Sequence, residues 1–262
     1  MRLLTDHAMV TVSGTKVAGE IGVSRSEIWR LVQQLRSMGV AIAGRPATGY
    51  QLERVPDLLL PDILAPLLKG TRFSEHILHF FRLGSTNAAA MHAAARGAPE
   101  GSVFLAEEQT AGRGRGGHSW HSAASTGIYC SVVLRPKLPP AEILVLSLAA
   151  GLAAADAVEH TTGLRPDLKW PNDLLIGVPA GEGACGYVIE GEGRDPSDGD
   201  GAHASMKKFC GILTELNAEV TRVRYAVVGV GINVNQAEFP AEIANLAASL
   251  RLAGGREWSR VE

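Results

Sequence analysis

The sequence predicts an α+β fold in two parts: a small winged helix-turn-helix, then a mixed β-sheet with flanking helices. Two observations predict it. Residues 1–52 contain two helical patterns followed by a β-hairpin pattern. From Ile77 onward, strand-like and helix-like segments alternate. With 262 residues, 46% of them hydrophobic, the chain can form one large domain or two smaller ones.

The first part opens with "TKVAGEIGVSRSEIWRLVQQLRSMGV", which predicts two helices around a break at Gly22–Val23. Ser24 followed by Glu27 is a capping box for the second helix. "VAIAGRPATGYQL" then predicts a β-hairpin that turns near 44–49. The apolar stripe of the second helix is formed by Ile28, Leu31, Val32 and Leu35. Its polar outer face is formed by Arg25, Ser26, Arg30 and Gln33.

This arrangement is typical of DNA-binding domains, although a small helical packing module has the same pattern. Residues 1–52 carry six Lys or Arg and three Asp or Glu, a net charge of +3. Met1–Val12 is a weak candidate for the opening helix that such domains have. We expect the domain to span 1–55, with a linker over 56–72. The candidate DNA contacts are Arg25, Ser26, Arg30 and Arg45.

The larger part, 73–262, contains five segments that predict strands and two that predict helices. The strand segments are "GSVFLAEEQ", "GIYCSVVLRP", "RPDLKW", "KFCGILTEL" and "RYAVVGVGINVN". The helical segments are "STNAAAMHAAARG" and "AEILVLSLAAGLAAADAVEH". Within the latter, the apolar run 143–155 is shorter than the ~18–20 residues of a membrane span, so we expect a buried helix and no membrane. The residues before Glu262 resemble the start of another helix.

Residues 177–206 interrupt this pattern with eight glycines, six acidic residues and one arginine. This composition predicts a flexible, solvated insertion without a role in a site.

The bulk composition excludes several classes of protein. The net charge of −2 gives no global field for nucleic acid or membrane, so any basic site must be local. The widely spaced Cys130, Cys185 and Cys210 fit neither a disulfide framework nor a metal site. Asp6 and His7 interrupt the only short apolar patch near the start, so no signal peptide is predicted. We therefore expect a cytoplasmic protein.

The stretch "GRGRGG" at 112–117 places Arg113 and Arg115 among four glycines. A nucleic-acid-binding Gly-Arg segment would be longer and repeated, and the sequence lacks the phosphate-loop pattern. A loop that cradles an anion is a third interpretation, because guanidinium groups pair with phosphate or carboxylate oxygens. An ordinary surface loop is the fourth.

Other polar motifs supply partners for such a loop. "STN" at 85–87 opens a helix, and "LKWPNDLLI" places Lys169, Trp170, Asn172 and Asp173 in the turn after a strand. "KKFCGILTE" puts Lys208 at a strand start with Gly211 nearby, and "VVGVGINVN" ends a strand with glycines that can pack on a flat ligand.

Together and in this order, these motifs resemble the biotin protein ligases. The resemblance runs from about Thr15 to Glu262, and its first part is similar to the family members that also repress biotin-synthesis genes. It implies a class II synthetase-like sheet. It also assigns biotin contacts to Ser85, Thr86, Asn87, Gln109, Arg113, Gly114, Arg115, Lys208 and Gly211. The nucleotide contacts would be Trp120, Asn172, Gly231 and Asn233.

The implied activity joins biotin to AMP from ATP and then transfers biotin to a lysine of a biotin carboxyl carrier protein. Lys208, Arg115, Lys169 and Asp173 would carry the chemistry, with Mg²⁺ bound through ATP and no metal held by protein alone. Operator DNA would be a second partner, and a homodimer is an option. The alternatives are a lipoyl ligase and a biotin-responsive regulator with little ligase activity.

Three departures from the family pattern stand out. Gly116, His118 and Ser119 replace further basic residues after the Gly-Arg core. The insertion separates "KWPND" from Lys208. The chain also ends before the small β-barrel domain of the family, which we expect to be absent.

Overall fold

The computed structural model describes the chain except for residues 1–3, 5–6, 8–9, 38–39, 46–47, 54–56 and 180–204. It divides into two compact units, Met1–Leu58 and Leu59–Glu262.

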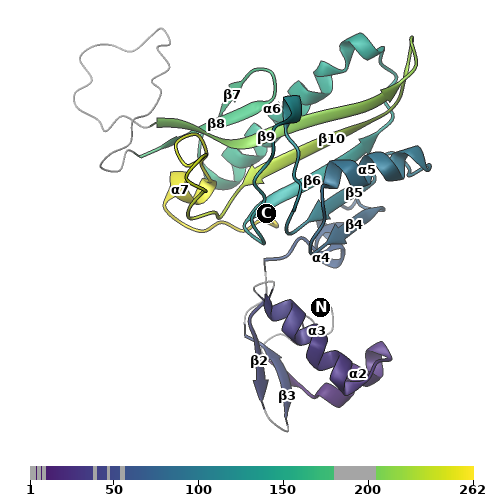
Figure 1. The fold of residues 1–262 in the computed structure, drawn as a ribbon, viewed down its shortest axis with the longest axis vertical. Coiled ribbons are helices and arrows are strands. Elements are labelled where there is room, and N and C mark those ends of the chain that lie inside the picture. The colour runs from purple at the N-terminus through teal and green to yellow at the C-terminus, as the bar shows by residue number, and fades with distance from the viewer. Residues whose placement is uncertain are drawn as a thin grey trace. The chain divides into compact units, whose positions relative to one another are not determined.

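The N-terminal unit contains a helix pair and a three-stranded antiparallel sheet of order β1-β3-β2 (Figure 1). Its elements are β1 (Thr11–Val12), α2 (Gly14–Ile21), α3 (Arg25–Ser37), β2 (Ile42–Arg45) and β3 (Gly49–Leu52). Gly22 ends α2 at φ 70°, where a side chain would be strained. The two expected helices and the expected hairpin are therefore present.

The interior of this unit follows the predicted stripe only in part. Ile28 and Val32 of α3 are buried with Leu52, whereas Leu31 and Leu35 are half-buried. Ser24 Oγ accepts a hydrogen bond from Glu27 N over 3.2 Å, which is one half of the expected capping box. The Glu27 carboxylate instead pairs with Arg30.

The larger unit is built on a seven-stranded mixed sheet of order β4-β5-β6-β10-β9-β8-β7 (Figure 1). All pairs are antiparallel except β4 with β5. The strands are β4 (Ile77–Phe80), β5 (Val103–Ala106), β6 (Gly127–Leu134), β7 (Asp167–Lys169), β8 (Asp173–Val178), β9 (Ser205–Ala218) and β10 (Val223–Asn233). This is the mixed sheet that the alternating segments predict.

Two helices cover opposite faces of the sheet. Val227 packs under α5 (Thr86–Ala95), and the next residue, Val228, belongs to the cluster under α6 (Leu144–Thr162). Because neighbouring strand residues point to opposite faces, the two helices lie on different sides. Short helical segments are α4 (Pro61–Leu67), η1 (Arg115–Gly117), η2 (Pro140–Glu142) and α7 (Leu250–Gly254).

The expectation of a buried helix at 143–155 is wrong for one face of α6. Ser147, Gly151, Ala154 and Val158 are buried, with a spacing that fits one helical face. Leu144, Val145 and Leu152 lie on the outside and are 48–61% exposed. By length and composition alone, Pro140–Thr162 could also cross a bilayer. Periodicity could not identify the buried face because the segment is apolar all round.

Other expectations need correction at their boundaries. The proposed linker 56–72 contains α4, and the division between units falls at Leu58–Leu59. The ends of the proposed insertion, 177–178 and 205–206, are strand residues, so Lys208 lies inside β9 rather than at its start. The rest of the insertion, 180–204, lies outside the described residues.

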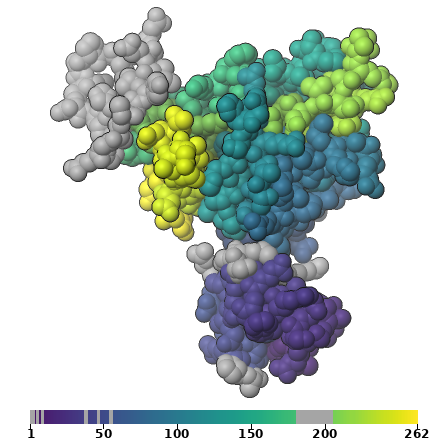
Figure 2. All heavy atoms as spheres, viewed as in Figure 1, coloured from purple at the N-terminus to yellow at the C-terminus, as the bar shows by residue number. Residues whose placement is uncertain are grey.

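The segment after α7 is not the expected start of a helix. It follows Gly255 without regular structure. Figure 2 shows the yellow C-terminal atoms packed against green and teal atoms of the same unit. Trp258 packs beside the main hydrophobic cluster, and Arg260 is 3% exposed. A basic residue that is so buried needs a partner, and Arg260 has one in Glu107.

Candidate active site

A pocket forms where β6, β9 and β10 meet the start of α5 and the Gly-Arg loop at 112–117. Its lining includes all nine residues for which we expect biotin contacts, and it also includes Trp120, Asn172 and Gly231. The free volume is about 40 Å³, which is room for a few water molecules. The sequence motifs therefore converge on one place from five separate segments.

Polar side chains are held tightly at the inner end of this pocket. Gln109 Oε1 accepts hydrogen bonds from Thr86 N at 2.8 Å and from Thr86 Oγ1 at 3.1 Å. Ser131 Oγ lies 2.8 Å from Thr86 Oγ1 and 2.6 Å from Asn87 Oδ1. Because Thr86, Asn87 and Ser131 are buried, these hydrogen bonds fix their geometry before any ligand binds.

The Gly-Arg loop is a folded hairpin. Gly114 N donates to His118 O over 2.7 Å, and Trp120 N donates to Gly112 O over 2.9 Å. Gly116 and Gly117 have φ of 68° and 83°, a region that strains other residues. The glycines thus have a geometric role in the turn of this loop.

Trp120 lines both this pocket and a second hollow of about 200 Å³. This hollow is also lined by Lys208, Asn233 and Phe239, so Trp120 and Asn233, two of the residues for which we expect nucleotide contacts, line the same hollow. A Cβ at Gly231 would lie 2.7 Å from the Trp120 ring, which explains a glycine there. Trp120 Nε1 is buried and makes no hydrogen bond among the described residues, so it can donate to a ligand.

Lys208 lines both hollows and carries the charge nearest to their boundary. Its Nζ lies 2.7 Å from Asp173 Oδ1 and 5.3 Å from the centre of the Trp120 ring. Asn172 Nδ2 donates to Ile212 O over 3.1 Å, which fixes the turn. Lys169 differs from the prediction: it is exposed at the end of β7 and lines neither hollow.

Glu215 is a residue of the site that sequence reasoning missed. Its Oε2 accepts a hydrogen bond from Asn87 Nδ2 over 2.9 Å, and its Oε1 lies 3.8 Å from Arg113 Nη1. One carboxylate therefore touches both the start of α5 and the Gly-Arg loop. The signal was present, because Glu215 ends "GILTE" two residues after Leu213, which lines the pocket, on the same strand face.

Tyr129 and Cys130 also line the pocket and were not predicted. Burial raises the pKa of the Cys130 thiol to about 12, so the side chain is neutral at pH 7. Burial likewise raises the pKa of Tyr129 to about 12. Neither group is therefore an anionic nucleophile, and the charged side chains that line the pocket are Arg113, Arg115 and Lys208. Among the described residues, Cys130 and Cys210 are free thiols.

Among the described residues, no cluster of three or more His, Cys, Asp or Glu side chains could hold a metal ion. Mg²⁺ commonly binds through one or two carboxylates together with substrate phosphates. Asp173, beside Lys208, fits that limited role.

The N-terminal unit contains a separate open groove between α3 and the β2–β3 hairpin. Three of the four expected DNA contacts, Arg25, Ser26 and Arg45, line it. Arg30 does not line it and pairs with Glu27 instead. Trp29, which was not predicted, lines the groove and is 59% exposed.

Two family models match the chain. Residues 81–233 match the "Biotin/lipoate A/B protein ligase family", which covers the pocket and most of the sheet. Residues 1–51 match "HTH domain".

Similar proteins agree with both models. The bifunctional ligase/repressor BirA of Bacillus subtilis is 34% identical over 251 residues, which are 95% of this chain and 69% of BirA. The BirA of Escherichia coli is 28% identical over 89% of this chain and 62% of its own length. The biotin protein ligase from Aquifex aeolicus in complex with biotin and ATP is 31% identical, with a TM-score of 0.51 over 71% of this chain.

The chain spans 64% of the Aquifex chain, slightly less than two thirds of its length. The ligase family model, which matches residues 81–233, includes all the pocket motifs and ends at Asn233, the last residue of β10. This chain belongs to the biotin/lipoate A/B protein ligase family.

Proposed function

We propose that the protein is a biotin–[acetyl-CoA-carboxylase] ligase. It forms biotinyl-5'-AMP from biotin and ATP, with release of pyrophosphate, and transfers biotin to a lysine of a carrier protein. The observation that carries the proposal is the convergence of all nine expected biotin contacts on one pocket, next to a second hollow lined by Trp120 and Asn233.

The first step needs cations rather than a base. The biotin carboxylate is already ionised at pH 7, so no proton has to be removed before it attacks the α-phosphorus. The obstacle is repulsion between the carboxylate and the phosphate oxygens. Arg113, Arg115 and Lys208 line the pocket and offset this repulsion as charge builds up on phosphorus. Lys169, which is exposed, acts at most at long range through screened charge.

The second step forms an amide. The neutral amine of the carrier lysine attacks the carbonyl carbon of the adenylate, the bond from that carbon to the AMP oxygen breaks, and the amine loses a proton. Asp173 lies at the boundary of the two hollows through its ion pair with Lys208, where it can hold the incoming ammonium group or contribute one carboxylate to Mg²⁺. The Mg²⁺ would be held mainly by the phosphates of ATP.

A biotin-dependent adenylation assay tests the proposal. The protein is incubated with α-labelled ATP and either biotin or lipoate, and a purified biotin carboxyl carrier domain is then added. We expect a labelled adenylate with biotin and biotin attached to the carrier lysine. An adenylate that forms with lipoate but not with biotin would assign a lipoyl ligase. Tight biotin binding with no adenylate would leave only a biotin-responsive regulator.

We also propose that the N-terminal unit binds DNA through the groove lined by Arg25, Ser26 and Arg45. Trp29 adds an apolar surface that suits a thymine methyl group. Recognition of a two-fold symmetric operator would require a homodimer. Electrophoretic mobility of random-sequence and selected duplexes, with and without biotin and ATP, measures this activity separately from ligation.

A further inference from the structure

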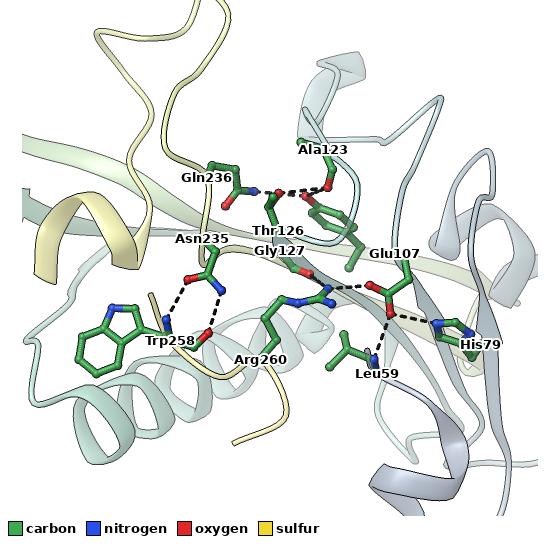
Figure 3. A network of polar contacts seen from close by, with 11 residues as sticks. Leu59, His79, Glu107, Ala123, Thr126, Gly127, Asn235, Gln236, Trp258 and Arg260 are labelled. Carbon is green, nitrogen blue, oxygen red and sulfur yellow. Dashed lines mark hydrogen bonds and ion pairs between the residues drawn. The ribbon is translucent and has the colours of Figure 1, made fainter. Parts of the chain in front are cut away.

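A buried ion pair lies behind the pocket, on the segment after α7. Arg260 Nη1 is 2.8 Å from Glu107 Oε2, and the two side chains are 0% and 2% exposed (Figure 3). Placing two charges in the interior is costly, and apolar residues of similar volume often serve stability as well or better. The pair therefore calls for an explanation beyond stability.

The position of the ion pair at the end of the β5–β6 ladder supplies such an explanation. The β5–β6 ladder ends where Ala106 pairs with Tyr129. Beyond this pair one more backbone hydrogen bond joins the two sides, from Ser125 N to Glu107 O over 2.9 Å, and the chain between them carries Gln109 and the Gly-Arg loop to the pocket. Arg260 links the two sides at that point, because Nη1 also donates to Gly127 O over 3.0 Å. Figure 3 shows the guanidinium between Glu107 and Gly127.

The carboxylate of Glu107 is also held from its other side. Its Oε1 accepts hydrogen bonds from Leu59 N and from His79 Nε2, each at 3.0 Å. Burial alone would raise the pKa of this carboxyl, but the hydrogen bond with His79 and the charge of Arg260 outweigh burial and lower it below its ordinary value. Glu107 is therefore an ionised and fixed point of attachment.

The two linked segments continue directly into the pocket. Gln109, which orients Thr86, follows Glu107 by two residues. Tyr129, which lines the pocket, follows Gly127 by two residues. A second link is provided by Asn235, which exchanges hydrogen bonds with Trp258 N and O over 2.9 and 2.8 Å and holds the segment against the end of β10.

We propose that Arg260 and Glu107 form a positioning pair for biotin binding, which sets the separation of the strand ends that carry Gln109 and Tyr129. Neither residue lines the pocket, so they act through these neighbours. The inference rests on the proposed function, because it concerns the biotin pocket of that ligase.

The test separates positioning from stability. In the double variant Glu107→Gln with Arg260→Met, both charges are removed together, so no unpaired charge stays buried. Arg260→Lys is a second variant that keeps the charge but loses the forked geometry. The matched control is Arg251→Met, which removes a surface arginine that pairs with Glu257 at 2.8 Å near the same segment. The melting temperature, the biotin Kd and the ATP Kd are measured for each.

We expect both test variants to weaken biotin binding by about tenfold, a shift of about 1.4 kcal/mol. ATP binding should change less than about twofold, since neither Gln109 nor Tyr129 lines the hollow that we assign to the nucleotide. A wild-type biotin Kd in either folded variant would overturn the inference, and so would equal losses for biotin and ATP. If the wild-type protein itself binds no biotin, the proposed function fails instead.

Discussion

Lys208→Ala should slow the formation of biotinyl-AMP much more than it weakens biotin binding. Lys208 lies at the boundary of the two hollows, where its Nζ is 2.7 Å from Asp173. The reacting phosphorus of ATP would lie between the biotin and nucleotide sites, at this boundary. Because negative charge accumulates there mainly in the transition state, a cation at this place lowers the barrier more than it stabilises bound substrate.

The magnitude follows from the charge and its surroundings. Two unit charges ~4 Å apart in an effective dielectric of ~20 interact by about 4 kcal/mol. The Lys208 side chain is 34% exposed, and solvent screening reduces such energies, so about half of that value is reasonable. The remaining ~2 kcal/mol corresponds to a rate about 30-fold slower. The loss in biotin affinity should stay below about fivefold.

Rapid-quench measurement of adenylate formation in a single turnover gives the rate, and calorimetry gives the biotin Kd. Lys207→Ala is the matched control. It is the adjacent residue of β9, lies outside both hollows, and donates from Nζ to Ala244 O over 3.1 Å. Equal losses of rate and affinity in Lys208→Ala would show that the lysine is a simple ligand contact. A loss as large in the control would point to damage of the strand.

Three further outcomes are expected. Arg115→Gly should release biotinyl-AMP into solution faster, because one guanidinium is lost from the loop over the pocket. An unchanged rate of release in a trapping assay would show that Arg115 does not retain the adenylate. DNA binding should weaken steeply as salt rises. In the double variant Arg25→Ala with Arg45→Ala, the slope of log binding constant against log salt concentration should become shallower by about 2, and a slope equal to wild type would exclude both phosphate contacts. Val178 pairs with Ser205, so an Asn-Gly turn can replace 179–204, and biotin affinity should change less than tenfold because loop-closure entropy varies slowly with length. A larger loss would mean that the insertion positions Lys208.

The residues that line the pocket could be predicted because each belongs to a motif with an unusual composition. A lysine beside Gly211 and arginines among glycines are hard to explain as core or as ordinary surface, so the sequence itself signals a site. The alternating segments predicted the mixed sheet for a similar reason, since period-2 runs and helical runs differ over their full length. The short strand β4 was missed, because its four residues contain the polar His79.

The supporting residues could not be predicted, for a physical reason. Arg260 lies in "REWSRVE", a polar segment that reads as exposed or as the start of a helix, and its burial depends on a partner 153 positions earlier in the chain. Glu107 and Glu108 are likewise adjacent acids, yet only the first is buried. The choice between them is made by strand direction at the end of β5, which turns Glu107 inward. Long-range pairing of single charges leaves no local pattern, so the groups that hold a binding site in place are harder to identify from sequence than the groups that line it.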